Sequence, residues 1–229
     1  MPSLTYRTAQ AVGLWLAEGD KRTNREVTFT NNEPSLISFF HKVMVDTLQP
    51  RYTPRIAVYL PFSGESYLRP VVTGRYRVYI DGRANRPYYI YRISGVLLVR
   101  KWRSIVSTTC KRKSNFRPVL QGFFAGESNV KEGSHGSRVV RVAQGMPNRF
   151  IEKLLAYFGI TCEYGGHREY TIQGRDNLEK ILALELMILH PSKQKRFQAM
   201  MAGYRQRHYS KNALYDLVYS QLQNPATTE

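Results

Sequence analysis

Two glutamates, Glu18 and Glu127, occupy the same place in a short pattern that occurs twice in the chain. One copy spans Val12–Asp20 and the other Leu120–Ser128; in each, a glycine opens an apolar run and the glutamate follows five residues later. The copies lie about half a chain length apart, in a chain of 229 residues. This repeat predicts a pseudo-two-fold molecule in which two carboxylates meet at the axis. Paired carboxylates hold divalent metal ions, which activate water for phosphodiester cleavage.

A simpler interpretation is that both glutamates end apolar helices by chance. A carboxylate at a helix C-terminus is disfavoured by the helix dipole, by about 0.3 kcal/mol or more. Two matched glutamates in a disfavoured place therefore favour metal binding. The large apolar residues of the same segments, Trp15, Phe123 and Phe124, are expected in the core rather than against a ligand.

The charge balance points to a polyanion as the partner. Lys and Arg number 34 against 17 acidic residues, which gives a formal net charge of +17. Residues 51–113 carry much of this excess, since fourteen Lys and Arg face only Glu65 and Asp81 there. A basic surface kept for solubility is the alternative, but solubility seldom needs so large an excess of one sign. The 16 tyrosines fit contacts to sugars and phosphates.

Several classes of protein are disfavoured by the sequence. No apolar run reaches the roughly 18 residues that span a membrane, and no signal or transit peptide is recognisable. We expect no membrane partner and no secretion, and a location in a prokaryotic cytoplasm and nucleoid or in an organelle matrix. Cys110 and Cys162 are expected to be free thiols in a reducing compartment. No nucleophilic Ser or Cys and no organic cofactor site is expected.

The two halves show the same order of elements, and we divide the chain into 1–112 and 113–229, the second half with a helical C-terminal tail. In the first half, Val27 and Phe29 alternate with polar residues in a strand, and Asn31 or Asn32 caps a helix that opens with Pro34. Val140, Val142 and Pro147 take the matching places in the second half. Further strands are predicted at Arg55–Leu60, Arg75–Ile80, Tyr88–Ile93 and Arg168–Ile172, a loop at Lys131–Ser137, a basic junction near the phosphates at Ser107–Arg117, and an amphipathic tail helix at Ser210–Gln223.

One face of the predicted strands suits DNA. In Arg75–Ile80 the apolar residues alternate with Arg and Tyr, so one face packs on the core and the other meets the nucleic acid. A register error of one residue would exchange these faces. By this parity, and by a turn at Asp81–Gly82, the expected DNA contacts are Thr28, Thr30, Arg75, Arg77, Tyr79, Arg83, Arg86 and Arg141. The remaining arginines nearby, Arg25, Arg51, Arg55 and Arg69, are interpreted as solvated charges.

The segments Val12–Asp20 and Leu120–Ser128 resemble the LAGLIDADG motif of homing endonucleases, in the form that carries two motifs in one chain. By the repeat, the resemblance extends over the chain up to about residue 205. It implies an α+β fold of two αββαββα halves, with the motif helices packed at the axis. It also implies a saddle of two antiparallel sheets that lies on DNA.

The resemblance assigns roles by position. Glu18 and Glu127 match the acidic residues that bind the catalytic metal ions, and Ala17 and Gly126 match the positions whose backbone carbonyls face a metal. Gly13 and Gly122 match the small residues that let the motif helices approach closely.

The second motif departs from the family pattern at Ser128, where the family has a second glycine. A serine in the left-handed conformation there would cost about 1 kcal/mol. Lys193 resembles a family lysine near the active site and is expected to support catalysis. The first half has no clean equivalent, and Lys111 and Lys113 are candidates by their proximity to the second motif.

The resemblance implies a monomeric, intron-type homing endonuclease that cuts both strands of a long, asymmetric DNA site. Mg²⁺ is the expected cofactor, two or more ions, with Mn²⁺ or Ca²⁺ substituting in binding. Two alternatives use the same fold and basic surface: an RNA-binding intron maturase, whose partner is intron RNA, and a DNA-binding regulator without cleavage.

Overall fold

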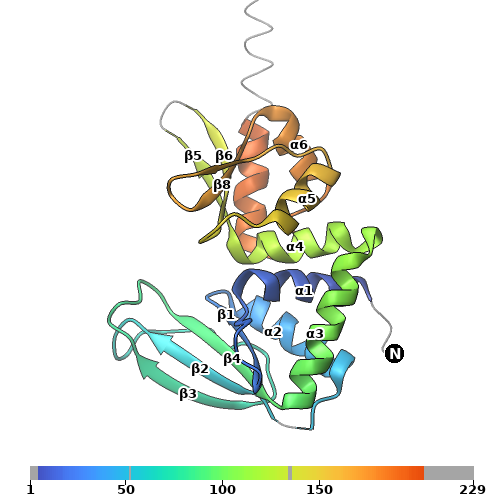
Figure 1. The fold of residues 1–229 in the computed structure, drawn as a ribbon. Coiled ribbons are helices and arrows are strands. Elements are labelled where there is room, and N and C mark those ends of the chain that lie inside the picture. Colours follow the sequence, from blue (N-terminus) through green and yellow to red (C-terminus); the bar gives the residue numbers. More distant parts are fainter. Residues whose placement is uncertain (1–4, 52, 134–135, 204–229) are drawn as a thin grey trace, which may run out of the picture.

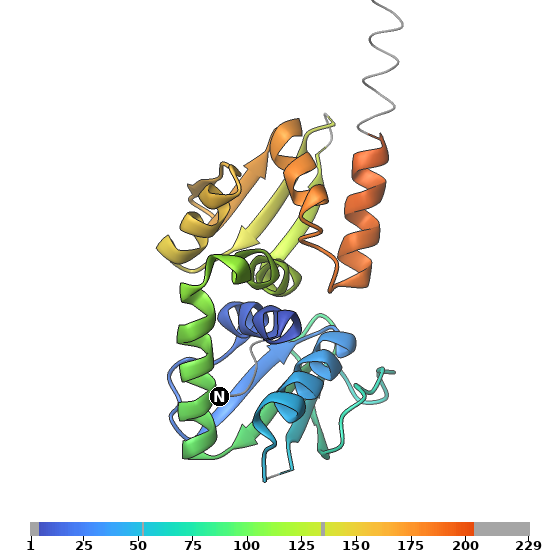
Figure 2. The ribbon, with the colours of Figure 1, turned by 90° about the vertical axis from the view of Figure 1, so that its right-hand side faces the viewer.

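The computed structural model describes residues 5–51, 53–133 and 136–203. Two halves, each a four-stranded sheet with helices, are stacked through two central helices (Figures 1 and 2). The first half contains α1 (Tyr6–Glu18), β1 (Glu26–Asn31), α2 (Pro34–Leu48), β2 (Arg55–Leu60), β3 (Arg75–Ile80), β4 (Tyr88–Ser94) and α3 (Val96–Lys111). After a 3₁₀ turn (Lys113–Asn115), the second half contains α4 (Phe116–Glu127), β5 (Ser128–Glu132), β6 (Arg138–Ala143), α5 (Arg149–Tyr157), β7 (Glu163–Gly165), β8 (Glu169–Gln173) and α6 (Arg175–Ala183).

A further helix covers residues 191–203 and packs beside the second sheet (Figure 2). The predicted tail helix Ser210–Gln223 lies outside the described residues. No helix within the described ranges combines the length and apolarity needed to cross a bilayer. The two cysteines, Cys110 and Cys162, are free thiols.

In β3 the prediction that the apolar face packs on the core is wrong, because Val78 is 47% and Ile80 is 56% exposed on that face. In β1 and β6 the predicted alternation is the one that the strands adopt. Val27 and Phe29 are buried in the first half, as are Val140 and Val142 in the second. Pro34 stands in the first turn of α2, but Glu33 caps that helix, and the prediction of an Asn31 or Asn32 cap is wrong. The Asn31 side chain instead accepts a hydrogen bond from the Glu33 backbone N–H at 2.9 Å, so it braces the capping residue.

The first sheet differs in detail from two antiparallel sheets. Its strand order is β1-β4-β2-β3, and β2 and β3 pair in parallel, so the sheet is mixed. The first half therefore runs αβαβββα, whereas the second runs αββαββα with an antiparallel sheet ordered β5-β6-β8-β7. Parallel neighbours need a long connection, and residues 61–74 supply it.

Strand β5 replaces the start of the predicted loop Lys131–Ser137. It follows α4 without a break and pairs with β6, Asn129 opposite Arg141 and Lys131 opposite Val139. Only Ser128 and Val130 of this strand are buried, so the alternation is too short to be recognised from sequence.

Helices α1 and α4 approach each other closely because both carry a glycine at the contact. A Cβ on Gly13 would stand 2.0 Å from the Val119 carbonyl oxygen, and one on Gly122 would stand 1.9 Å from the Gln10 carbonyl oxygen. No other residue type fits at such separations. The contact is reciprocal, so it fixes the ends of both helices, and hence Glu18 and Glu127, relative to one another.

A buried amide pair adds polar contacts at this helix interface. The Gln10 Nε2 donates to the Gln121 Oε1 at 2.8 Å, and the Tyr6 hydroxyl donates to the same oxygen at 2.8 Å. The Gln121 Nε2 donates to the Leu184 carbonyl at 2.9 Å. Because a buried amide is costly unless it is paired, this network favours one register of α1 on α4.

Candidate functional site

The two motif helices end at the glutamates. After Glu18 the chain leaves α1 at Gly19 with φ −86°, and after Glu127 it leaves α4 at Ser128 with φ −79°. Both caps are extended, so the expected strain of a left-handed Ser128 is absent. The Ser128 hydroxyl donates to the Phe124 carbonyl at 2.5 Å, which satisfies the end of the helix. A Cβ at Gly19 would stand 2.2 Å from the Trp15 ring, which explains the glycine there.

Glu18 and Glu127 are half-buried carboxylates without direct partners. Among the described residues, neither forms a hydrogen bond within 3.5 Å or an ion pair within 4.0 Å. Burial raises the pKa of both carboxyls, and the pKa of Glu127 reaches about 8 because the Glu18 charge adds to the effect of burial. The charges of Lys21 and Lys193 lower the pKa of both carboxyls, and the Glu18 charge raises the pKa of Glu127. The four groups therefore form one electrostatic cluster.

Lys193 lies at the end of α4. Its ammonium donates to the carbonyls of Ala125 at 2.7 Å and Gly126 at 2.9 Å. Burial lowers the pKa of Lys193 to about 8, while the charges of Glu18 and Glu127 act in the opposite direction. Lys193, the lysine predicted from the family resemblance, therefore lies beside the carboxylates. The Gly126 carbonyl to which it donates is one of the two that the resemblance expects to face a metal.

Lys21 is the basic residue of the first half that sequence reasoning missed. Its ammonium lies 3.5 Å from the Ala17 carbonyl, and burial lowers its pKa against the charges of Glu127 and Glu18. The equivalent place in the second half, three residues after the motif glutamate, holds Val130. A search by internal repeat could not find Lys21, although its position right after the first motif was a usable signal.

Lys111 and Lys113 lie at the wrong end of α4 to serve this cluster. Lys111 ends α3, and the Lys113 ammonium lies 5.9 Å from the centre of the Tyr157 ring. Both precede Phe116, where α4 begins, whereas Glu127 ends it. The helix between them spans about 18 Å, so the junction Ser107–Arg117 is also remote from the carboxylates.

A cavity of about 650 Å³ opens beside the carboxylate cluster. Its charged lining combines Glu18 with Lys193, Arg86 and Arg196. His190 also borders it, and burial followed by the Lys193 charge lowers the pKa of that imidazole to about 4, so it is neutral at physiological pH. The cavity takes residues from both halves and is dominated by cations, which suits an anionic ligand.

The predicted DNA contacts lie on the outward faces of the sheets, in the cavity beside the carboxylates, and in the turn after β3. Arg75, Arg77 and Tyr79 lie on the outward face of β3, next to Arg55, Ala57 and Tyr59 of β2, and Thr28 and Thr30 lie on the same face of β1. Thr28 is nearly covered, and its hydroxyl accepts a hydrogen bond from the Asp20 backbone N–H at 3.2 Å. Arg86 lines the cavity.

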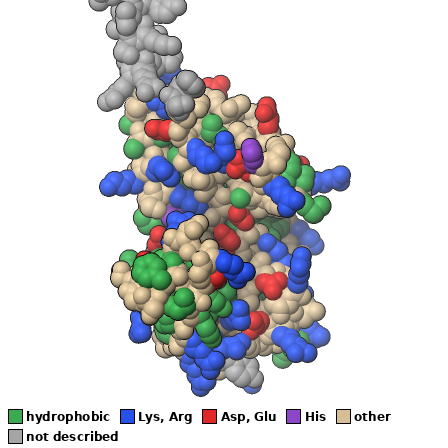
Figure 3. All heavy atoms as spheres, turned by 90° about the vertical axis from the view of Figure 1, so that its left-hand side faces the viewer, with side chains coloured by type: hydrophobic (Ala, Val, Ile, Leu, Met, Phe, Trp, Pro, Cys, Tyr) green, Lys and Arg blue, Asp and Glu red, His purple; other side chains and the backbone are tan. Residues whose placement is uncertain are grey.

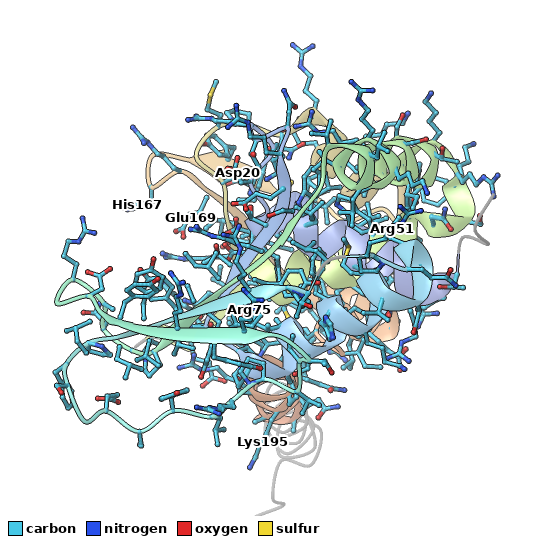
Figure 4. The ribbon with its side chains drawn as sticks, turned by 90° about the horizontal axis from the view of Figure 1, so that it is seen from below. Asp20, Arg51, Arg75, His167, Glu169 and Lys195 are labelled. Atoms are coloured by element: carbon cyan, nitrogen blue, oxygen red, sulfur yellow. The ribbon has the colours of Figure 1, made fainter. Side chains whose placement is uncertain are left out.

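Two of the predicted arginines have acidic partners. The Arg83 side chain is 93% exposed and lies 3.2 Å from Asp81 in the turn. Arg141 lies on the outward face of β6, where its guanidinium contacts Glu169 at 2.7 Å. In the view from below, Arg75 lies on the strand side and Arg51 beside the helices (Figure 4).

Four residues of the same outward face were missed or set aside: Arg55, Tyr59, Tyr88 and Arg92. The strand register places Arg92 opposite both Arg55 and Thr28, and Tyr88 opposite Tyr59. Arg55 alternates with the buried Ile56 and Val58, a signal that was present in the sequence. From the strand side, acidic side chains lie near the junction of the halves and basic ones lie around them (Figure 3).

The donors at the junction fit a divalent ion. No group of three or more His, Cys, Asp or Glu that could hold a metal exists among the described residues, so an all-protein cage is absent there. Mg²⁺ needs few protein ligands, because it keeps several waters and takes phosphate oxygens. Two desolvated carboxylates without partners match that requirement, whereas the carbonyls of Ala17 and Gly126 here accept hydrogen bonds from the ammonium groups of Lys21, at 3.5 Å, and Lys193, at 2.9 Å.

Comparison with solved structures tests the fold. The complex of the homing endonuclease I-DmoI with DNA and Mn matches with a TM-score of 0.50 at 14% identity, over 80% of this chain and 97% of that one. Its complex with DNA and Ca matches with a TM-score of 0.50 at 14% identity, over 86% and 97% of the chains. Full-length DUF199/WhiA from Thermatoga maritima matches with a TM-score of 0.51 at 12% identity, over 97% of this chain and 72% of that one.

No protein-family model matches the sequence, and no curated protein does. At such low identity the structural matches establish the fold alone. The repeated motifs, the reciprocal glycine contact and these matches agree: the chain has the LAGLIDADG fold, in the form in which two motif helices pack within one chain.

Proposed function

We propose that this protein is a divalent-metal-dependent endodeoxyribonuclease that cuts both strands of a long, asymmetric DNA site, as an intron-type homing endonuclease does. The observation that carries the proposal is the pair of half-buried carboxylates, Glu18 and Glu127, held without partners at the junction of two sheets. A structure with no catalytic role would have little reason to keep two such carboxyl groups together, because each loses hydration without gaining a partner.

The metal site would use one carboxylate from each half. Glu18 and Glu127 would supply oxygen ligands, and the carbonyls of Ala17 and Gly126 would supply further ones where the Lys21 and Lys193 ammonium groups leave those oxygens. Mg²⁺ when bound lowers the pKa of a coordinated water and offsets charge on the phosphate, and Mn²⁺ or Ca²⁺ would bind the same oxygens. The complexes of I-DmoI with DNA and Mn, and with DNA and Ca, make such a site reasonable for this fold.

The lysines would act on the DNA. Lys193 and Lys21 each place an ammonium at the end of one motif helix, within the electrostatic reach of both carboxylates. A cation held there offsets the charge that develops on a scissile phosphate. Arg86 and Arg196, in the adjoining cavity, would hold neighbouring phosphates. We extend the proposal to a monomer, because one chain supplies both motif helices, acting in a prokaryotic cytoplasm or an organelle matrix.

A supercoiled plasmid that carries the joined flanking sequence of the gene's own insertion site tests the proposal. Wild-type protein with Mg²⁺ should give linear plasmid, EDTA should prevent it, and the E18Q/E127Q double variant should bind the plasmid without cutting it. Tight binding by the wild type without cleavage in Mg²⁺ or Mn²⁺ would contradict the proposal. The remaining functions would then be a DNA-binding regulator or an intron RNA maturase, which binding to the intron RNA separates.

A further inference from the structure

The outward face of the first sheet carries a cluster of four arginines. The β2–β3 register sets Arg55 beside Arg75, with Arg77 beside Ala57, and Arg92 of β4 stands opposite Arg55. Together with Tyr79 these side chains border a hollow of about 130 Å³. A hollow of this size with guanidinium groups around it suits a phosphate group, because a guanidinium donates two parallel hydrogen bonds to such an anion.

The cluster keeps most of its charge uncompensated. Glu26 is the acid in reach, 2.7 Å from Arg55 and 4.0 Å from Arg92. Arg75 and Arg77 are exposed and form no ion pair with any residue of the described ranges. The Arg92 Nε is buried without a hydrogen-bond partner in that same part of the chain. Four cations against one carboxylate leave the hollow strongly positive.

A row of tyrosines continues the face beyond the arginines. The Tyr59 ring stacks between those of Tyr79, at 5.2 Å between centres, and Tyr88, at 4.7 Å. The Tyr88 hydroxyl donates to Asp81 at 3.0 Å, which fixes one end of the row. Because Tyr59 lies between the other two rings, both of its faces are covered and only its edge is free for a ligand, so this ring does not serve to stack on an unpaired base.

The matching face of the second sheet lacks this excess. Its charged residues are Lys131, Arg141, Glu163 and Glu169, which alternate with buried strand residues and sum to zero formal charge. Arg141 is already paired with Glu169 at 2.7 Å. Within the strands that the structure describes, Lys131 is thus the one cation of this face with no acidic partner in range.

We propose that the two halves divide DNA binding unequally. The first sheet, through the cluster of Arg55, Arg75, Arg77 and Arg92, anchors the duplex by its phosphates, and the second sheet adds little affinity. The proposal rests on the proposed function in one respect, that the polyanion is duplex DNA. One half of the target site would then fix the protein on the DNA through its phosphates, whatever the sequence, while the other half would be held weakly.

The difference in affinity between the two sheets can be measured through the release of counterions from the DNA. Each phosphate neutralised by a cation contributes about 0.9 to the slope of log affinity against log salt concentration. A fluorescein-labelled duplex of random sequence, titrated with protein in EDTA over a range of NaCl concentrations, reports that slope by fluorescence anisotropy. The matched variants are R77A and K131A, which each remove one exposed cation from the outward face of one sheet.

R77A should lower the salt slope by about 0.9 and raise the dissociation constant by about eightfold near 0.1 M salt. K131A should change the dissociation constant by less than about twofold, and R75A/R77A should lose about twice the slope that R77A loses. Equal losses in R77A and K131A, a larger loss in K131A, or no binding of the wild type to duplex DNA would overturn the proposal. The assay contains no metal and no cleavage, so an unequal loss would stand even if the plasmid were never cut.

Discussion

The positions of Glu18 and Glu127 suit the proposed metal binding but lower the stability of the fold. Each carboxylate ends a helix, where the dipole disfavours it, and each is partly removed from water without a partner. Lys21 and Lys193 offset part of this cost from the ends of the same helices. Residues selected for folding alone would not have this arrangement, so each of them should reveal its role when it is replaced.

Replacing Glu127 with Gln should stabilise the metal-free protein above neutral pH. Burial raises the pKa of this carboxyl from 4.5 to about 8, so between these values the folded state binds a proton that the unfolded state has released. Stability from this group is therefore fully present below pH 4.5 and falls as the pH rises to about 8. At pH 8 in EDTA, E127Q should exceed the wild type by about 1 kcal/mol or more in the free energy of unfolding.

Denaturant unfolding at pH 5 and pH 8 measures this effect, with E169Q as the control. The Glu169 carboxylate is paired with Arg141 at 2.7 Å, so its loss should lower stability rather than raise it. An E127Q protein no more stable than the wild type at pH 8 would show that the carboxylate has a partner in solution.

Lys21 should matter for cleavage as much as Lys193 does. K21M and K193M each remove an ammonium beside the carboxylates, so each should slow single-turnover cleavage at saturating protein by about tenfold or more, while the dissociation constant rises by no more than about eightfold. K111M, at the far end of α4, should cut at the wild-type rate. If K21M cuts as fast as K111M, Lys21 has no part in the reaction.

At the scale of elements, the contact between α1 and α4 is the most sensitive part of the fold. Ala at position 13 or 122 would place its Cβ about 2 Å from a backbone oxygen of the partner helix, where no side chain can move aside. G13A and G122A should each lower the free energy of unfolding by about 3 kcal/mol or more, measured by urea denaturation. G82A is the control, since a Cβ there meets nothing within 4 Å; a loss of the same size in G82A would contradict the explanation.

The sequence predicts most elements because their side chains alternate with a clear period. Strands β2 and β3 have the predicted bounds, and the buried sides of β1 and β6 are the predicted ones. Strand β5 was missed because it buries only Ser128 and Val130, too few for a pattern. The parallel pairing of β2 with β3 was missed because the partner of a strand is set by the path of residues 61–74, which carries no periodic signal.

The candidate site was only partly predictable, for a similar reason. The repeat marks residues that have a counterpart in the other half, and it finds Glu18, Glu127, Gly13 and Gly122. It cannot find Lys21 or Arg92, which have no counterpart. In the sequence, Lys21 is marked only by its position right after the first motif, and Arg92 became recognisable when the strand register was known.

At the scale of the whole molecule, pseudo-symmetry describes the junction better than the sheets. The motif helices contact each other reciprocally, but the first sheet is mixed and basic, whereas the second is antiparallel and balanced in charge. Under the proposed function, such a molecule would cut two strands with related sites and still recognise an asymmetric sequence. Cleavage, unlike recognition, depends on the carboxylates being the catalytic centre, which is the central claim.

Strand-resolved cleavage tests that claim most directly. A duplex of the joined insertion-site sequence, with a different dye on each strand, is cut under single turnover with Mg²⁺ by the wild type, E18Q and E127Q. We predict that the wild type cuts both strands, and that each variant loses cleavage of at least one strand while it still binds the duplex. Cleavage of both strands at the wild-type rate by either variant, or wild-type cleavage that persists in EDTA, would contradict the account.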